Sequence, residues 1–458
     1  MRVAVLVLSA CAFAACASDP MLAARGAYSA GDYVAARAAI DELIADDGSN
    51  AHLWRAERSM VDLAQAQPKA AIAGLRSARD AYDDSEGSDA LGWLGSVLLD
   101  DRQMRYQGYD YEKILLRALL GAADLMQGGA DAIAYGLQVF EVQQRLMDAY
   151  ADQGGQKPKL RYKQVAFGNY LRAIVQEGDP LQMEEARRNH QKVAEIEPGF
   201  RFAKENVERV TSGKHSAKGN GVVHVIALVG RGPYRVEKNE VATQVSLAIA
   251  QWIWARSRDR GILPNIAKVP IPGLAYHPDN PQQALVSVDG GTAVSTATVT
   301  DVEAAARNEF DVMRDAIVAR AVLRRAFKIV VAEGAKAGIE AGGRRQKDRQ
   351  ATELASLAVD GLALLWTATE GADLRCWSLL PASFQVLRLE LPVGAHTIAV
   401  QSGRSGNVGG IAATVDVDVR DGTNSYVLAL LPVFGGAPTV MTSHPAAAAG
   451  SPTEPAPE

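Results

Sequence analysis

Asp373, Arg375 and Trp377 alternate along one short segment, which brings an acid, a base and an aromatic ring close together. Such a set could recognise a protein partner, since aromatic and arginine side chains dominate the binding energy of many interfaces. It could equally fix the segment between a helix and a strand, because exposed ion pairs contribute little energy. The sequence favours this structural role and leaves the partner-binding role open.

No pattern typical of catalysis, metal binding or cofactor binding occurs elsewhere in the chain. The seven histidines are scattered and lack paired metal-ligand spacing. Gly230-Arg231-Gly232 follows an apolar run but lacks the later glycine and lysine of a phosphate-binding loop. We therefore expect a binding protein, with no catalytic residue, no metal and no cofactor. A hydrolase with an unrecognised site is the weaker alternative.

Cys16 ends a segment with the features of a signal peptide. Arg2 gives a positive start, and residues 3–15 form an apolar run that is too short to span a bilayer. With Ala14-Ala15 before it, Cys16 resembles the lipidated cysteine of bacterial lipoproteins. Leu8-Ser9-Ala10-Cys11 fits that consensus better but would need a start codon further upstream. An ordinary cleaved signal with an incidental cysteine is the alternative.

The lipoprotein resemblance implies a location. A triacylated Cys16 would attach the protein to a membrane, since each buried methylene contributes about 0.8 kcal/mol. Ala17 follows the cysteine, where an aspartate would resemble an inner-membrane retention signal. We expect the periplasmic face of the outer membrane of a Gram-negative envelope. The remaining cysteine, Cys376, lies beside Trp377, and we expect it to be a buried small apolar residue.

Residues 23–210 have the pattern of alanine-rich helix pairs that recur along the chain. Small and aliphatic residues repeat at a spacing of 35, the pairs being Ala35 with Ala70 and Ile40 with Leu75. Further copies begin near residues 128 and 169, whereas residues 83–109 interrupt the pattern. The pattern resembles tetratricopeptide repeats, whose period is about 34 residues. Such an α-solenoid presents a concave surface for partners, and a plain helical bundle is the alternative.

The C-terminal half has a different pattern, in which apolar and polar residues alternate along predicted strands. These strands cover residues 222–229, 284–288, 293–299, 384–391, 395–400, 412–420 and 425–431. Turns are expected at Asp289-Gly290 and Asp421-Gly422. His224 interrupts the first strand, and we expect a core histidine bonded to a backbone carbonyl.

Three helices are expected between these strands. Asn239 is a plausible N-cap for the first, and Thr300 with Glu303 has the spacing of a capping box for the second. The third covers residues 351–367. The fold class is therefore multidomain α+β: a tetratricopeptide-like α-solenoid followed by an α+β domain with a mostly antiparallel sheet.

Four segments resemble a family of uncharacterised bacterial outer-membrane lipoproteins with an N-terminal tetratricopeptide-like region. They are Tyr109-Asp110-Tyr111-Glu112-Lys113, residues 300–307, residues 373–381 and residues 388–397. The resemblance covers most of the mature chain. It implies architecture and location, and the family has no established chemistry to transfer.

The predicted organisation has six parts: a signal peptide (1–15), a lipidated linker (16–22), the helical repeats (23–210), a linker (211–221), the α+β domain (222–435) and a disordered Ala/Pro-rich tail (436–458). A net charge of −5 gives no basic field for nucleic acid. We expect a lipid-anchored scaffold, without enzymatic activity, that binds periplasmic or outer-membrane proteins in envelope or peptidoglycan assembly. The alternative is a structural subunit of a homo-oligomeric envelope assembly.

Overall fold

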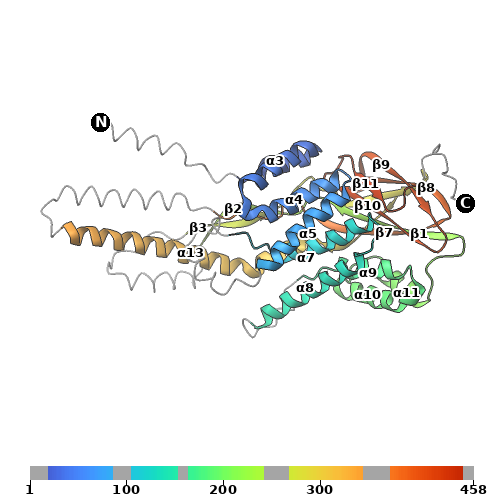
Figure 1. Cartoon of the computed structure of the whole chain (residues 1–458), viewed down its shortest axis with the longest axis horizontal. Coiled ribbons are helices and arrows are strands. Elements are labelled where there is room, and N and C mark those ends of the chain that lie inside the picture. The colour runs from blue at the N-terminus through green and yellow to red at the C-terminus, as the bar shows by residue number, and fades with distance from the viewer. Residues whose placement is uncertain (1–18, 86–104, 153–162, 242–267, 344–371, 447–458) are drawn as a thin grey trace, which may run out of the picture.

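The computed structural model describes residues 19–85, 105–152, 163–241, 268–343 and 372–446 (Figure 1). It is a mixed α+β protein in which a run of helices precedes sheets whose strands pair mostly antiparallel, and one long helix, α13 (Val302–Gly343), lies between strands β6 (Ala297–Asp301) and β7 (Ser383–Pro392) along the chain. Cys16, the signal peptide, the helix predicted at 351–367 and the end of the tail lie outside the described residues. Among the described helices, none combines the length and apolar character needed to cross a bilayer.

The N-terminal helices pack each against the next along the chain. Asp32 begins the second of them, since its carboxylate accepts a hydrogen bond from the Ala35 amide at 3.0 Å. The helices are α2 (Leu22–Ser29), α3 (Tyr33–Asp46), α4 (Ala51–Ala64), α5 (Pro68–Ser85), α7 (Asp110–Leu125), α8 (Ala132–Asp152), α9 (Phe167–Gln176), α10 (Met183–Ile196) and α11 (Ala203–Thr211).

The 35-residue spacing is kept between the first two copies, but the small residues in the helix contacts differ from the prediction. Ile40 and Leu75 are fully buried, as the 35-residue spacing predicts. The fully buried alanines are Ala36 and Ala71, whereas Ala35 is exposed. Between these two copies the period was therefore correct, and the alanines were wrong by one position. In the copy that begins near residue 128, Leu137 was aligned with Ile40, and it is 39% exposed, so that alignment was wrong. Stacking of these helices into a regular solenoid remains a prediction.

The strands of the described segments form three sheets. The five-stranded sheet has the order β11-β10-β1-β7-β6, with β1 and β10 parallel and the other pairs antiparallel. Its strands are β1 (Asn220–Val229), β6 (Ala297–Asp301), β7 (Ser383–Pro392), β10 (Asn424–Leu431) and β11 (Thr439–Thr442). The four-stranded sheet has the order β5-β4-β8-β9, with β4 (Gln283–Val288), β5 (Val294–Ser295), β8 (Gly394–Arg404) and β9 (Asn407–Val419). β2 (Tyr234–Val241) pairs with β3 (Lys268–Ala275).

The five-stranded sheet is the middle of three layers. Alternate residues of β1 point to opposite faces: Ile226 and Leu228 pack in one hydrophobic cluster with the N-terminal helices. Val225 and Ala227 pack in a second cluster with the four-stranded sheet. Burial on both faces explains why β1 is almost continuously apolar. The helices and the sheet therefore share one core across the predicted linker at 211–221.

Four details differ from the sequence-based expectations. Asn239 lies within β2 and caps no helix. Thr300 lies in β6, and Asp301 caps the long helix α13 (Val302–Gly343) by accepting from the Ala304 amide at 2.8 Å. The turn at Asp421-Gly422 connects β9 and β10, which belong to different sheets. The predicted tail is ordered at its start, where Thr439–Thr442 forms β11.

Candidate functional site

The segment containing Asp373, Arg375 and Trp377 is packed against the N-terminal helices. Nη2 of Arg375 lies 2.7 Å from Oδ2 of Asp373, and Nη1 donates to Oδ1 of Asn50 at 3.0 Å. Trp377 is fully buried, and its backbone N–H donates to Oε1 of Glu112 at 2.8 Å. The structure thus places these side chains at an internal contact between helices and sheet.

Buried carboxylates hold this segment in place. Glu57 on α4 accepts hydrogen bonds from the backbone amides of Ser378 and Leu379, at 2.6 and 2.9 Å, and from the Ser378 hydroxyl at 2.8 Å. Burial raises the pKa of Glu57 to about 8, although these hydrogen bonds act in the opposite direction. Glu112 on α7 accepts from the hydroxyl of Tyr106 at 2.6 Å as well as from Trp377. Both carboxyl groups accept hydrogen bonds from amide donors that would otherwise be buried unpaired.

Cys376 has the environment expected from the sequence. Its side chain is 3% exposed. Burial raises the pKa of the thiol well above its usual value, and the nearby Glu112 carboxylate raises it further. The thiol is therefore protonated at neutral pH and unreactive as a nucleophile.

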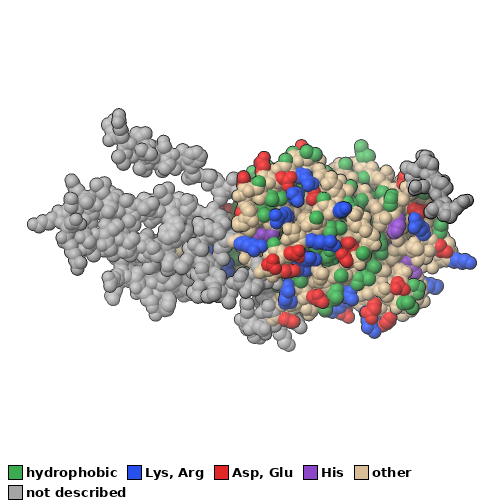
Figure 2. Space-filling view, viewed as in Figure 1, with side chains coloured by type: hydrophobic (Ala, Val, Ile, Leu, Met, Phe, Trp, Pro, Cys, Tyr) green, Lys and Arg blue, Asp and Glu red, His purple; other side chains and the backbone are tan. Residues whose placement is uncertain are grey.

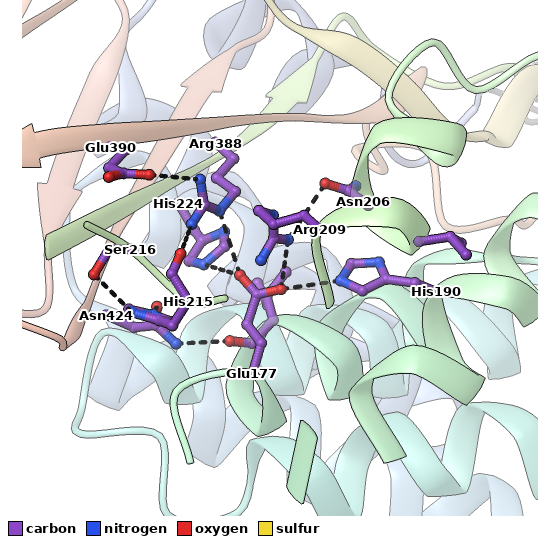
Figure 3. A network of polar contacts seen from close by, with 12 residues as sticks. Glu177, His190, Asn206, Arg209, His215, Ser216, His224, Arg388, Glu390 and Asn424 are labelled. Atoms are coloured by element: carbon purple, nitrogen blue, oxygen red, sulfur yellow. Dashed lines mark hydrogen bonds and ion pairs between the residues drawn. The ribbon is translucent and has the colours of Figure 1, made fainter. Parts of the chain in front are cut away.

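A second network, centred on Glu177, joins five elements (Figure 3). Glu177 follows α9 and is fully buried. Oε2 lies 3.1 Å from Nε2 of His190 on α10 and accepts from Nη2 of Arg209 on α11 at 2.7 Å. Oε1 lies 3.2 Å from Nε2 of His224 on β1 and 3.5 Å from Nε of Arg388 on β7. Contact with this carboxylate replaces the backbone-carbonyl bond predicted for His224.

The charges in this network follow from its surroundings. Burial opposes ionisation of Glu177, but the two histidines and Arg209 outweigh burial and hold its pKa well below the usual value. Burial lowers the pKa of His224 to about 4 and also lowers that of His190, against the attraction of Glu177. At neutral pH the carboxylate is therefore ionised between two arginines, and both imidazoles are neutral. Because these groups are buried, the network orients α10 and α11 on the sheet.

A groove open to solvent lies beside this network, between α8, α9 and α10, and has a volume of about 450 Å³. Helical spacing gathers its lining residues, since positions three, four and seven apart share one helix face. They are Phe140 and Gln144 on α8, Asn169 and Arg172 on α9, and Glu185, Arg188, Asn189 and Lys192 on α10. The sequence reasoning missed this site, although the spacing within each helix was a signal that could have found it.

Two glycines set the geometry of the groove. A Cβ atom at Gly168 would lie 2.6 Å from Cβ of Val139, so α8 and α9 approach more closely than larger residues allow. A Cβ atom at Gly136 would lie 2.6 Å from Cγ of Arg172. The aliphatic part of Arg172 therefore lies directly over Gly136, which fixes where the guanidinium enters the groove.

The surface around the groove carries both signs of charge. Figure 2 shows basic and acidic side chains interspersed over the visible helices. Arg188 lies 3.1 Å from Glu185, and Lys192 lies 3.0 Å from Glu195. Arg172 differs, because within the part of the chain that the structure describes it has no ion-pair partner and its buried Nε has no hydrogen-bond acceptor. It is therefore the cation of this groove that remains available for a ligand.

Within the described ranges, no three His, Cys, Asp or Glu side chains gather closely enough to hold a metal ion.

No protein-family profile, no curated protein and no solved structure matches this chain. The lipoprotein resemblance thus rests on the sequence motifs alone.

Proposed function

We propose that this protein is an envelope lipoprotein, acylated at Cys16, that binds a periplasmic or outer-membrane protein through its helical segment. Binding, not catalysis, is its role in this proposal. The signal-like residues 3–15 and the cysteine after them support the anchor. The buried spacing of Ile40 and Leu75 supports the finer proposal that the helices form a tetratricopeptide-like solenoid.

The observation that carries the proposal is the groove between α8, α9 and α10. Its volume of about 450 Å³ lies in the range of natural ligand sites, roughly 300–1,000 Å³. It combines a half-buried ring, Phe140, with amide groups and the unpaired Arg172. In contrast, the buried Glu57, Glu112 and Glu177 are engaged by amides, hydroxyls and cations of the protein itself. The groove is therefore the better ligand site.

A photo-reactive amino acid at Gln144 tests this proposal in intact cells. Gln144 lines the groove, so illumination should join the protein to a distinct partner that mass spectrometry identifies. The matched control carries the same amino acid at Val408, an exposed position on β9. A partner captured at Val408 and absent at Gln144 would contradict the proposal.

One observation favours a second candidate, a homo-oligomeric structural subunit. β9 is an edge strand of the four-stranded sheet; its end is bridged by Pro445 at Val417, but its first half exposes Val408 and Ile411, the latter 84% exposed. Unpaired strand edges can pair with another chain. Cross-linking from Val408 to a second copy of the same protein would support this candidate.

The anchor has its own test. Cys16→Ser should release the protein from the membrane fraction or leave it unprocessed, since the acylated thiol would be lost. Mass spectrometry of the N-terminal peptide of the natural protein should show an acylated Cys16. An unmodified mature N-terminus at another residue would contradict this part of the proposal.

A further inference from the structure

The groove contains polar groups suited to a particular ligand chemistry. Arg172 contributes a positive charge whose aliphatic part is fixed over Gly136. Three residues earlier on α9, Asn169 is 4% exposed, and its amide lines the groove with no hydrogen bond to any residue that the structure describes. A side-chain amide both donates and accepts, so it complements a peptide group.

The opposite wall restricts which anion fits. Arg188 and Lys192 on α10 are paired with acidic neighbours, and Glu185 places a carboxylate in the lining itself. Because Arg188 and Lys192 are paired, Arg172 contributes the one uncompensated charge of the groove, which suits a single negative charge better than a phosphate dianion. The geometry of a guanidinium, with its forked donors, matches a carboxylate.

The groove is also anchored to the rest of the molecule. Nδ2 of Asn189, another lining residue, donates to Oε1 of Gln176 at 2.8 Å, and the next residue, His190, contacts the buried Glu177. The position of α10 relative to α9 is thus fixed before a ligand arrives. A fixed wall lowers the entropic cost of binding.

We infer that the groove binds an acidic peptide segment of the partner: Arg172 pairs with one aspartate, glutamate or C-terminal carboxylate, while Asn169 bonds the neighbouring peptide group and Phe140 contacts an apolar side chain. This inference rests on the proposed function and adds the ligand class.

Fluorescence anisotropy with the purified full-length protein tests the inference. The probe is a labelled peptide of alternating glutamate and alanine, and the comparison peptide has glutamine in place of glutamate. The acidic peptide should bind more tightly, and added salt should weaken its binding. Arg172→Gln should weaken it about tenfold or more, as expected for loss of a charge-assisted hydrogen bond.

The matched control is Arg187→Gln, which removes the same charge from α10 but lies outside the groove, where Arg187 pairs with Glu184 at 2.6 Å. It should leave binding unchanged, and Arg172→Lys should restore part of the affinity. Equal binding of the acidic peptide to Arg172→Gln, with both variants folded by circular dichroism, would overturn the inference. So would inorganic phosphate displacing the peptide at similar concentration.

These outcomes are separable from failure of the proposed function. If a partner is cross-linked at Gln144 and Arg172→Gln does not change peptide binding, the protein binds a partner through the groove. The acidic ligand class is then rejected. Absence of any Gln144 cross-link would reject both.

Discussion

His224 shows why a buried polar residue needs a three-dimensional explanation. Its place in an apolar strand correctly indicated burial, and the structure makes it 1% exposed. The predicted partner was wrong, because Glu177 belongs to a helix end far away in the sequence. No spacing rule connects the two residues. Local sequence patterns cannot predict contacts between groups that meet only where a helix packs on a sheet.

The protonation of His224 predicts a dependence of stability on pH. The unfolded imidazole takes up a proton near pH 6.5, whereas the folded group does so near pH 4. Between these values the unfolded state binds more protons, so this group lowers the free energy of unfolding as the pH falls, by about 3 kcal/mol in total. Glu177 changes the free energy of unfolding only at lower pH, because its pKa in the folded protein lies below its usual value.

Denaturant unfolding of the wild type and of His224→Gln at several pH values measures this contribution. The variant has no imidazole to titrate at this position, so the stability difference between the two proteins should change in favour of the variant from pH 6.5 to pH 4. Other buried histidines, such as His52, titrate in both proteins and cancel in the difference. Parallel stability curves across this range would count against the buried, neutral assignment of His224.

At the scale of elements, the buried carboxyl groups of Glu57 and Glu112 fix the segment around residues 372–379 to the helices. Replacing Glu57 by alanine leaves the Ser378 and Leu379 amides without an acceptor inside the core. Each unpaired buried donor costs about 1–3 kcal/mol, so Glu57→Ala should destabilise the protein by about 3 kcal/mol or more.

Thermal and denaturant unfolding of Glu57→Ala give that value directly. Asp41→Ala is the control, because it removes a carboxylate that pairs with Arg58 on the surface, where about 1 kcal/mol or less is expected. An effect of Glu57→Ala no larger than that of Asp41→Ala would contradict the role given to Glu57.

The sequence predicted elements well where one face of a strand or helix is buried, and poorly elsewhere. Alternation along β9 placed Val417 and Val419 inside and Asp416 outside, as observed. β2 was mistaken for a helix start because Glu237-Lys238-Asn239 has no apolar alternation. Asp421-Gly422 was correctly identified as a turn, but a turn signal does not say which sheet the next strand joins.

At the scale of the whole molecule, the layer of helices and the five-stranded sheet share one hydrophobic cluster. Ile226, Leu228 and Phe384 belong to the same hydrophobic cluster as the helices from α2 to α9. A repeat pattern predicts that helices have an apolar face, and it cannot tell whether other helices or a sheet cover that face. The sequence-based division into helical repeats (23–210) and an α+β domain (222–435) therefore omitted the core that the two parts share.

Residues 17–210 produced alone should lack a cooperative unfolding transition and should bind hydrophobic dyes, because the face that meets the sheet would be exposed. Adding a fragment of residues 211–458 should restore the transition. Circular dichroism during thermal unfolding, with dye fluorescence, makes the comparison. A cooperative helical transition for residues 17–210 without dye binding would show that the shared core is dispensable.

In the proposal above, the groove between α8, α9 and α10 receives the partner through Arg172. The most direct measurement is the yield of the Gln144 photo-cross-link in cells that carry Arg172→Gln, relative to cells that carry Arg187→Gln. With equal protein levels and equal membrane attachment, the cross-linked partner should fall about tenfold in the first strain and stay unchanged in the second. An undiminished cross-link in the Arg172→Gln strain would contradict the account.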